Sequence, residues 1–454
     1  MTPPPSSSWP RRRVLTLPLA LAAARSAWAQ AAPGVSEREI VLGQFAALSG
    51  PAAQLGLRLQ AGMKAWFAQV NAAGGVGGRS IRLVARDDGY EAEKAPAAVK
   101  ALINEDKVFA LAGSVGTPTG LAAVPVINEA GIPLVGMFTG AQALREPFNR
   151  NLFHVRASYF DETERIVQHL TTLGVKKIGV FYQNDSYGQA GLTGVRNALT
   201  RRKMEPAGLG TVERNSVDVT QALDSLLKAE PEAIVQISAY KSCAAFIKAA
   251  RTRGYGGQFF NVSFVGSKAL ADELGDAGVG VVISQVVPFP FQPAMPVVRD
   301  YQQHMTAAGD KEIDFSSMEG YLIARVVTEG LRRAGKNLTR ESFVAGLESM
   351  REVDIGGFKV TFSPQNHEGS KFTDLTIIGR GGRFMLWGGG WLWGGNALHS
   401  LEAAARGIRL IVRWLVVVRR PAAGVFVWAV RGRRSLHLAS PPLSPRPFPP
   451  PPGR

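Results

Sequence analysis

The sequence predicts an α/β protein made of two doubly wound lobes that are joined by a multi-strand hinge, with a ligand cleft between them. Three observations predict this fold class. Strand-like and helix-like segments alternate from Glu39 onward, the alternation restarts after Asn151, and a long helical segment with two strand-like segments follows. Such alternation favours mostly parallel sheets with helices on both faces. The segments after the second series indicate that the chain returns to the first lobe, and two lobes connected in this way favour a hinged pair.

The first series reads as βαβαβαβ. EIVLGQFAAL is strand-like, and residues 53–70 have apolar side chains on one helical face. The glycines of NAAGGVGGRS predict a turn. The segments that follow are a strand (IRLVARDD), a helix (EKAPAAVKALINE), a strand (VFALAG), a helix after Gly116 and a strand (GIPLVGMF).

The second series predicts another α/β lobe. Its strands are KKIGVFYQND, EAIVQIS and QFFNVSFVG, and its helices are DETERIVQHLTTLG, GQAGLTGVRNALTRR and AAFIKAARTRG. GVVISQVVPFP reads as a crossing segment, and helices are expected at 317–335 and 339–350. Residues 357–384 are expected to form two final strands joined by a turn at PQNHEG. These patterns assign residues 35–157 plus 287–360 to lobe 1, and 158–286 plus 361–387 to lobe 2.

The two ends of the chain have a different composition. RRRVLTLPLALAAARSAWAQ has a basic start, an apolar run and small residues at Ala27 and Ala29, which predicts a secretory signal peptide over residues 1–29. Sec and twin-arginine export both remain open. The arginine- and proline-rich tail, residues 388–454, is expected to be disordered. It is either a non-functional extension or a segment that binds a membrane or a partner.

The net charge of +16 does not indicate nucleic-acid binding, because most of it lies at the ends. Residues 401–454 carry +9 and residues 1–29 carry +4, which leaves +3 for residues 30–400. A nearly neutral body lacks the field of a nucleic-acid binder. Cys243 is the only cysteine, so an intrachain disulfide and cysteine-type zinc sites are excluded.

The sequence contains no pattern typical of an enzyme, a cofactor site or a metal site. The histidines are not spaced as metal ligands, and the G-x-S-x-G motif of hydrolases and the Walker A phosphate-binding motif are missing. Gly75-x-Gly77 follows a helix instead of a strand, which argues against a dinucleotide-binding turn. Adjacent Asp87 and Asp88 on a strand would point to opposite faces, so we expect them at a solvated strand end and not around a shared metal ion.

ALAGSVGTPTGLAAVPV, residues 110–126, joins a predicted strand to a predicted helix at the edge where doubly wound sheets bind ligands. Thr117 suits the N-cap and Pro118 the first helical position. The amides of Thr119 and Gly120 would then lack intrahelical partners and face the cleft. Because no lysine follows, a carboxylate suits this turn better than a phosphate, and a helix cap without a ligand is the alternative.

Other candidate residues follow neighbouring strands. Phe138, Thr139 and Gly140 lie at the next strand end of the first lobe, where their backbone could share the same ligand and Phe138 could supply an apolar wall. In the second lobe Tyr187 and Tyr240 each follow a strand. Two aromatic side chains at equivalent strand ends could close over the ligand as a lid.

Residues 35–387 resemble the periplasmic binding proteins of the branched-chain amino-acid (Leu/Ile/Val-type) ABC importers. The resemblance rests on NAAGGVGGRSIRLVARDD, LINEDKVFALAGSVGTPTGLAAVPVINEAGIPLVG and VFYQNDSYGQAG, in this order and spacing. It implies the type I periplasmic binding fold with two Rossmann-like lobes and closure of the hinge on a ligand. It also implies a periplasmic location, delivery to an ABC permease in the inner membrane, and no cofactor. We expect a monomer.

The resemblance also implies site residues. It places the carboxylate-binding hydroxyl and amide on Thr117, backbone contacts on 138–140, and the second-lobe aromatic residues on Tyr187 and Tyr240. Phe264 stands where amino-acid binders of the family have an acidic residue for the ligand ammonium.

A buried ammonium without a carboxylate is costly. We therefore expect an apolar or aromatic carboxylate or a small amide, with an amino acid as the other option, and Lys241 as a candidate additional positive charge. The expected function is the solute-binding component of an ABC importer, and a ligand sensor of the same fold that reports to a signalling partner is the alternative.

Overall fold

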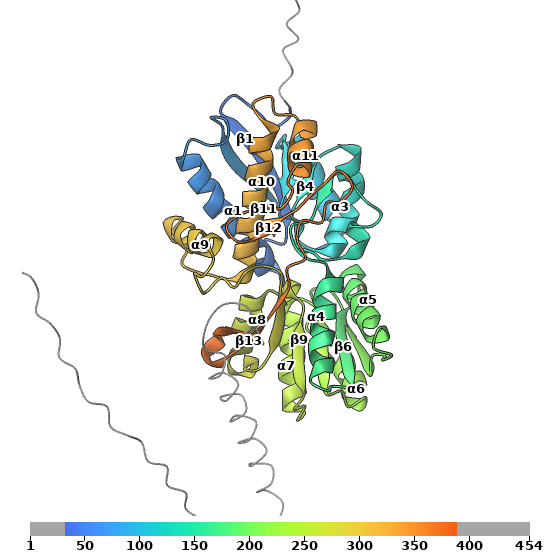
Figure 1. Cartoon of the computed structure of the whole chain (residues 1–454). Coiled ribbons are helices and arrows are strands. Elements are labelled where there is room, and N and C mark those ends of the chain that lie inside the picture. The colour runs from blue at the N-terminus through green and yellow to red at the C-terminus, as the bar shows by residue number, and fades with distance from the viewer. Residues whose placement is uncertain (1–31, 388–454) are drawn as a thin grey trace, which may run out of the picture. The chain divides into compact units, whose positions relative to one another are not determined.

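The computed structural model describes residues 32–387, and it confirms an α/β fold with two lobes, each built on its own sheet (Figure 1). The predicted signal peptide and the predicted tail lie outside the described residues. Strands β1 (Glu39–Ala46) and β3 (Ala110–Ala112) of the first sheet and β6 (Ile178–Gln183) and β8 (Ala233–Ile237) of the second are largely buried, as in parallel sheets whose two faces are covered by helices.

The first sheet has five parallel strands in the order β2-β1-β3-β4-β5. Its strands are β1 (Glu39–Ala46), β2 (Ser80–Asp87), β3 (Ala110–Ala112), β4 (Leu134–Val135) and β5 (Leu152–Phe153). The helices of this part of the chain are α1 (Ala53–Ala72), α2 (Ala95–Asn104), α3 (Thr117–Glu129), η1 (Gln142–Leu144), α9 (Pro296–Ala307), α10 (Phe315–Ala334) and α11 (Arg340–Glu348). α10 packs against α1 and α11, so a late segment of the chain completes the first lobe.

The contact between α1 and α10 depends on two glycines. A Cβ atom on Gly62 would lie 1.8 Å from the carbonyl oxygen of Ser317, and one on Gly320 would lie 1.9 Å from the carbonyl oxygen of Leu59. Real Cβ atoms do not approach oxygen this closely. The two helices therefore meet backbone to backbone, which only glycine permits at these positions.

The second sheet has seven strands in the order β14-β13-β10-β9-β8-β6-β7, with β13 antiparallel to both of its neighbours. Its strands are β6 (Ile178–Gln183), β7 (Gly208–Val212), β8 (Ala233–Ile237), β9 (Gln258–Asn261), β10 (Val282–Gln285), β13 (Asp374–Ile378) and β14 (Phe384–Leu386). The helices of this part are α4 (Tyr159–Thr172), α5 (Ser186–Thr200), α6 (Thr220–Lys228), α7 (Tyr240–Thr252), η2 (Ser263–Val265), α8 (Ser267–Leu274), η3 (Gly275–Gly278) and η4 (Arg380–Gly382).

Three sequence-based expectations for this lobe need correction. The first part of GVVISQVVPFP, which was predicted to be a crossing segment, forms strand β10 of the second sheet. Strand β7 and helix α6 were not predicted, because GLGTV is short and glycine-rich. The two final strands were predicted wrongly as a pair joined at PQNHEG. Instead β12 (Lys359–Val360) pairs with β11 (Val353–Asp354), while β13 pairs with β10 and with β14 through η4.

The chain passes between the two sheets three times, at 154–158, 286–295 and 370–373. The first crossing is held to a later part of the chain, because His154 N–H donates to the carbonyl of His367 at 2.9 Å and Gly369 N–H donates to the carbonyl of His154 at 2.7 Å. The predicted lobe boundary at 360/361 therefore falls within a stretch that continues to contact the end of β5. The exact division into lobes stays a prediction.

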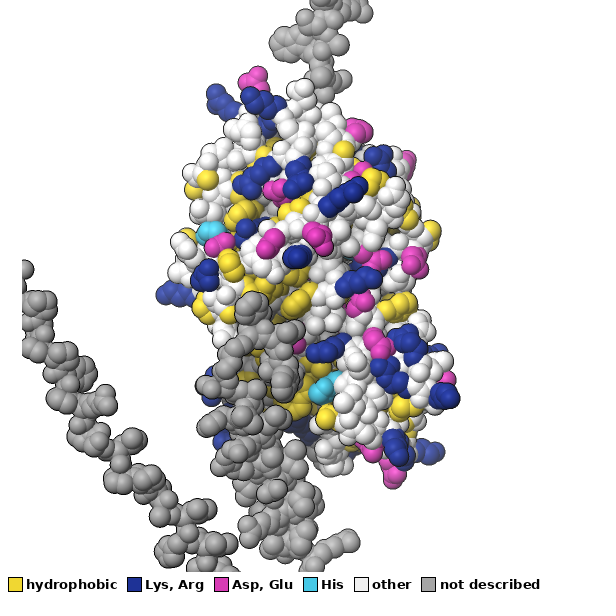
Figure 2. Space-filling model, in the orientation of Figure 1, with side chains coloured by type: hydrophobic (Ala, Val, Ile, Leu, Met, Phe, Trp, Pro, Cys, Tyr) yellow, Lys and Arg dark blue, Asp and Glu magenta, His cyan; other side chains and the backbone are white. Residues whose placement is uncertain are grey.

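The visible face in Figure 2 carries Lys and Arg side chains interspersed with Asp and Glu side chains. This distribution agrees with a nearly neutral body and not with a basic binding surface. Among residues 32–387 no helix has the length and apolar character required to cross a membrane.

Candidate functional site

The turn between β3 and α3 is shaped by Gly116. This residue is the N-cap of α3 with φ 105° and ψ 150°, a conformation that favours glycine. The prediction of Thr117 as N-cap was therefore wrong by one residue: Thr117 is the first helical residue and Pro118 the second. The amide of Gly120 was also expected to be free, but it donates to the carbonyl of Gly116 at 3.2 Å.

Thr117 and Thr139 lie together at the edge of the first sheet. Both are buried, and their hydroxyl oxygens are 2.6 Å apart in a hydrogen bond. Gly140 has a different role, because its carbonyl accepts from the amide of Tyr159 at 2.7 Å and a Cβ atom there would lie 2.6 Å from the same nitrogen. The structure thus brings the predicted 138–140 turn next to Thr117 and against the first crossing segment.

The aromatic side chain of Phe264 lies at the centre of a buried cluster that both lobes supply. Its ring centroid is 5.8 Å from that of Tyr90 and 5.6 Å from that of Phe138, both in the first lobe. It is 4.4 Å from the ring of Tyr187 in the second lobe. All four side chains are at most 1% exposed. We call these four residues the aromatic cluster.

Tyr90 was missed in the sequence, although it follows β2 just as Tyr187 follows β6. Its hydroxyl accepts a hydrogen bond from Gln183 Nε2 at 3.1 Å, which links the first lobe to the second. Its ring also packs against Gly116, where a Cβ atom would lie 2.4 Å from Tyr90 Cε2. Tyr90 therefore connects the β3–α3 turn to the facing lobe.

Several buried polar atoms around the aromatic cluster have no hydrogen-bond partner among the described residues. They are Ser114 Oγ, Arg156 Nη1 and the hydroxyl groups of Tyr159 and Tyr187. The Tyr159 ring lies 5.4 Å from the Tyr187 ring. Buried polar groups without partners are uncommon in folded proteins, and their concentration at strand ends favours a ligand-binding site.

Arg156 and Glu162 form a buried ion pair at the first crossing. Arg156 Nη2 is 3.4 Å from Glu162 Oε1, and both side chains are fully buried. Glu162 also accepts from the amide of Ser263 at 2.8 Å and from the hydroxyls of Ser263 and Ser284 at 3.0 and 2.5 Å. Burial raises the pKa of Glu162, while Arg156 and these hydrogen bonds favour its ionised form.

Glu319 of α10 is the second acidic residue at Arg156. Its Oε1 lies 3.6 Å from Arg156 Nε and has no hydrogen-bond partner in the described part of the chain. Burial raises the pKa of Glu319 to about 7. No local pattern in the sequence indicates this contact, because Arg156 and Glu319 are far apart in the chain and belong to different predicted segments.

Asp88 was expected at a solvated strand end, and this was wrong. The side chain is 0% exposed, its Oδ1 accepts from the amide of Tyr90 at 2.8 Å, and burial raises its pKa to about 7. Asp87, in contrast, accepts hydrogen bonds from Leu48 and Ser49 near the surface. Within residues 32–387 no three His, Cys, Asp or Glu side chains are grouped to hold a metal ion.

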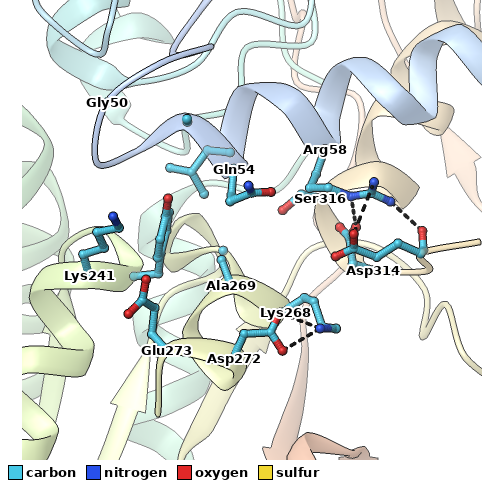
Figure 3. A pocket seen from close by; sticks show the side chains of 15 residues that line it. Gly50, Gln54, Arg58, Lys241, Lys268, Ala269, Asp272, Glu273, Asp314 and Ser316 are labelled. Atoms are coloured by element: carbon cyan, nitrogen blue, oxygen red, sulfur yellow. Dashed lines mark hydrogen bonds and ion pairs between the residues drawn. The ribbon is translucent and has the colours of Figure 1, made fainter. Parts of the chain in front are cut away.

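Tyr240 does not join the aromatic cluster. It lines a neighbouring groove of about 620 Å³ between the two lobes, together with Lys241. Figure 3 shows this groove with Gln54 and Arg58 of α1 on one side and Lys268 and Asp272 of α8 on the other. The two tyrosines expected to act together therefore occupy different places, Tyr187 inside the cluster and Tyr240 beside it.

Removal of the Tyr90 hydroxyl is expected to weaken ligand binding. In Tyr90→Phe the first lobe loses its hydrogen bond to Gln183, which favours the closed arrangement of the lobes by about 1 kcal/mol. We expect a roughly fivefold lower ligand affinity in calorimetry. Tyr255→Phe is the matched control, because the buried Tyr255 hydroxyl has no partner among the described residues. An equal loss in both variants would contradict a role for the Tyr90 contact.

Residues 39–378 match a family model described as periplasmic binding protein. The match covers most of the chain, and together with the two-lobe geometry it defines the class. The chain belongs to the periplasmic binding protein family and has the type I fold of that family.

Two solved structures and one curated relative illustrate the similarity. A possible leucine/isoleucine/valine-binding protein from Rhodopirellula baltica SH 1 is 34% identical with a TM-score of 0.75, over 78% of this chain and 98% of that chain. A substrate-binding periplasmic protein from Ralstonia solanacearum is 33% identical with a TM-score of 0.73, over 77% and 100%. The Leu/Ile/Val-binding protein homolog 7 of Brucella abortus (strain 2308) is 25% identical over 50% of this chain. The chain spans only 59% of the length of this relative.

Proposed function

We propose that this chain is the periplasmic solute-binding component of an ABC importer. It captures a small ligand with a carboxylate, either an amino acid or an apolar or aromatic carboxylate, and delivers it to a permease in the inner membrane. In this role the protein binds and releases its ligand and catalyses no reaction. The names of the relatives, which include Leu/Ile/Val-binding and substrate-binding proteins, support the proposal.

The observation that carries the proposal is the composition of the aromatic cluster and its surroundings. Tyr90 and Phe138 come from the first lobe, and Tyr187 and Phe264 from the second, with unpaired polar atoms next to them. A site assembled from two lobes binds its ligand fully only when the lobes close. Ligand binding then shifts an open–closed equilibrium, which is how a binding protein signals its loaded state.

Within the site, Thr117, Thr139 and the backbone of 138–140 are proposed to contact the ligand from the first lobe. Tyr187 and Phe264 are proposed to contact it from the second. Tyr240 is proposed to line the path into the site, because it faces the groove between the lobes.

Two measurements test the proposal. Small carboxylates, amino acids and amides are screened for a raised melting temperature, since a ligand that binds only the folded state stabilises it. For a ligand found in this way, small-angle scattering is expected to show a smaller radius of gyration on binding. A verified ligand that leaves the scattering unchanged would argue against closure of the lobes.

The alternative function is a ligand sensor of the same fold that reports to a signalling partner. The two functions share the site and the closure and differ in the partner. A pull-down with the loaded protein that recovers a permease favours transport, and one that recovers a signalling kinase favours sensing.

A further inference from the structure

Arg156 combines complete burial with an N–H group that no described residue accepts. Its Nη2 is directed at Glu162 Oε1 and at Ser263 Oγ, and its Nε faces Glu319. Nη1 has no hydrogen-bond partner among the described residues, and Nε has only the ion-pair contact with Glu319 at 3.6 Å. An unpaired N–H of a buried charged group is costly, so an acceptor supplied by a ligand would bind there favourably.

The free Nη1 belongs to a guanidinium that lies against the aromatic cluster. Arg156 Cζ is 4.8 Å from the centre of the Phe138 ring, and Phe138 in turn contacts Phe264. The Tyr187 ring lies 4.4 Å from the Phe264 ring, and its buried hydroxyl has no partner among the described residues. An acidic group bound at Nη1 would therefore lie at the edge of an apolar surface.

The charges around Arg156 favour an anion at this point. Burial alone would lower the pKa of Arg156, but the carboxylates of Glu319 and Glu162 more than offset burial, so the guanidinium stays charged. Glu162 accepts three hydrogen bonds and balances that charge in its ionised form. Glu319 accepts none, and its pKa of about 7 allows it to take up a proton when another negative charge arrives.

An ammonium group is less suitable at the same place. It would lie near the positive guanidinium, and Phe264 provides no carboxylate that could form an ion pair with it. The two glutamates face the edge of the guanidinium formed by Nε and Nη2, which is the edge away from Nη1. A zwitterionic amino acid whose carboxylate is bound at Nη1 would therefore bring its ammonium close to a positively charged guanidinium, which is unfavourable.

We propose that Arg156 is the carboxylate anchor of the ligand site, through Nη1, and that the ligand is an apolar or aromatic monocarboxylate without an α-ammonium group. Its apolar part lies against Phe138, Phe264 and Tyr187. This inference rests on the proposed function and specifies its substrate class.

The test compares each carboxylate with its uncharged amide. Calorimetry is performed with phenylacetate and 4-methylpentanoate, with phenylacetamide and 4-methylpentanamide, and with leucine and phenylalanine. The wild-type protein is expected to bind at least one of the two carboxylates more than about tenfold tighter than its amide. Arg156→Gln is expected to weaken carboxylate binding about 100-fold and to abolish the preference over the amide, as for loss of a charge-assisted hydrogen bond. The ratio of carboxylate affinity to amide affinity isolates the contribution of the charge, because binding of either ligand requires the same closure of the lobes.

Arg145→Gln is the matched control for loss of a buried arginine at the hinge. Arg145 Nη2 donates to the carbonyls of Arg156 and Ala157 in the same crossing, and Arg145 is not part of the aromatic cluster. This variant is expected to keep the preference for the carboxylate. If Arg156→Gln does not fold, Arg156→Lys decides, because it keeps the charge but shortens the reach and is expected to lower the preference about tenfold.

The direction of the pH dependence provides a second readout. Because binding of an anion favours the protonated form of Glu319, carboxylate affinity is expected to fall as the pH rises from 6 to 8. The inference is overturned if the preference survives in Arg156→Gln, if leucine or phenylalanine binds tighter than both carboxylates, or if affinity rises with pH. The proposed function would survive these outcomes. It fails in a different way, when no small solute binds the wild-type protein or changes its scattering.

Discussion

Gly62→Ala is expected to destabilise the first lobe by about 3 kcal/mol, because the added methyl group would meet the backbone of α10. The nearest atom is the carbonyl oxygen of Ser317, which is part of a helix and cannot move aside as a flexible side chain could. Alanine has a higher intrinsic helix propensity than glycine by about 1 kcal/mol, so propensity alone predicts the opposite result. Circular dichroism is expected to show a melting temperature lower by roughly 6 to 12 °C.

Gly256→Ala provides the control for this substitution. No atom lies within 4 Å of the position that its Cβ would take, and its φ lies outside the region reserved for glycine. The melting temperature of this variant is expected to stay within about 2 °C of wild type. Similar losses in both variants would show that the close contact between α1 and α10 does not determine the result.

Glu319→Gln is expected to make the ligand-free protein more stable at pH 8 and to leave it nearly unchanged at pH 4.5. The pKa of Glu319 is raised by burial to about 7, so the folded state holds more protons than the unfolded state between about pH 4.5 and 7. The free energy of unfolding of wild type therefore falls as the pH rises through this range. The contribution of Glu319 to this loss is on the order of 3 kcal/mol. Glutamine does not ionise, so the variant does not undergo this loss of stability.

Urea unfolding at pH 5, 6, 7 and 8 measures the effect. Asp88, which also has a pKa raised to about 7, adds a similar slope to both proteins and cancels in their difference. Glu230→Gln removes a carboxyl group from the exposed surface and controls for the change in net charge. A constant difference between Glu319→Gln and wild type over the whole range would contradict ionisation of Glu319 in this window.

The sequence predicted the features that local patterns encode. Period-two and period-3.6 patterns identified the main strands and helices, and their order led to two doubly wound lobes. The strand-end rule found Phe138 and Tyr187, and the family resemblance pointed to Phe264; the structure brings all three into one cluster. The same rule would have found Tyr90 after β2, because GYE follows that strand just as SYG follows β6.

The structural features that could not be predicted from the sequence depend on contacts between distant segments of the chain. Glu319 approaches Arg156 only because α10 packs onto the first lobe, and no local pattern encodes that contact. The pairing of β13 with β10 and β14, and not with the strand before PQNHEG, is likewise decided by the sheet that accepts it.

The packing of α10 against α1 also determines the order in which the molecule can fold. Trp66 Nε1 donates to Thr328 Oγ1 across 262 residues of sequence, so this part of the first lobe cannot be completed until α10 has been synthesised. The parallel strands β6 to β10 of the second lobe lie within a continuous stretch and need no such wait. Because closing a long loop is entropically costly, we expect the continuous β6–β10 part of the second lobe to fold before the first lobe is completed. A chain cut short before α10 would expose the apolar face of α1 and be prone to aggregation.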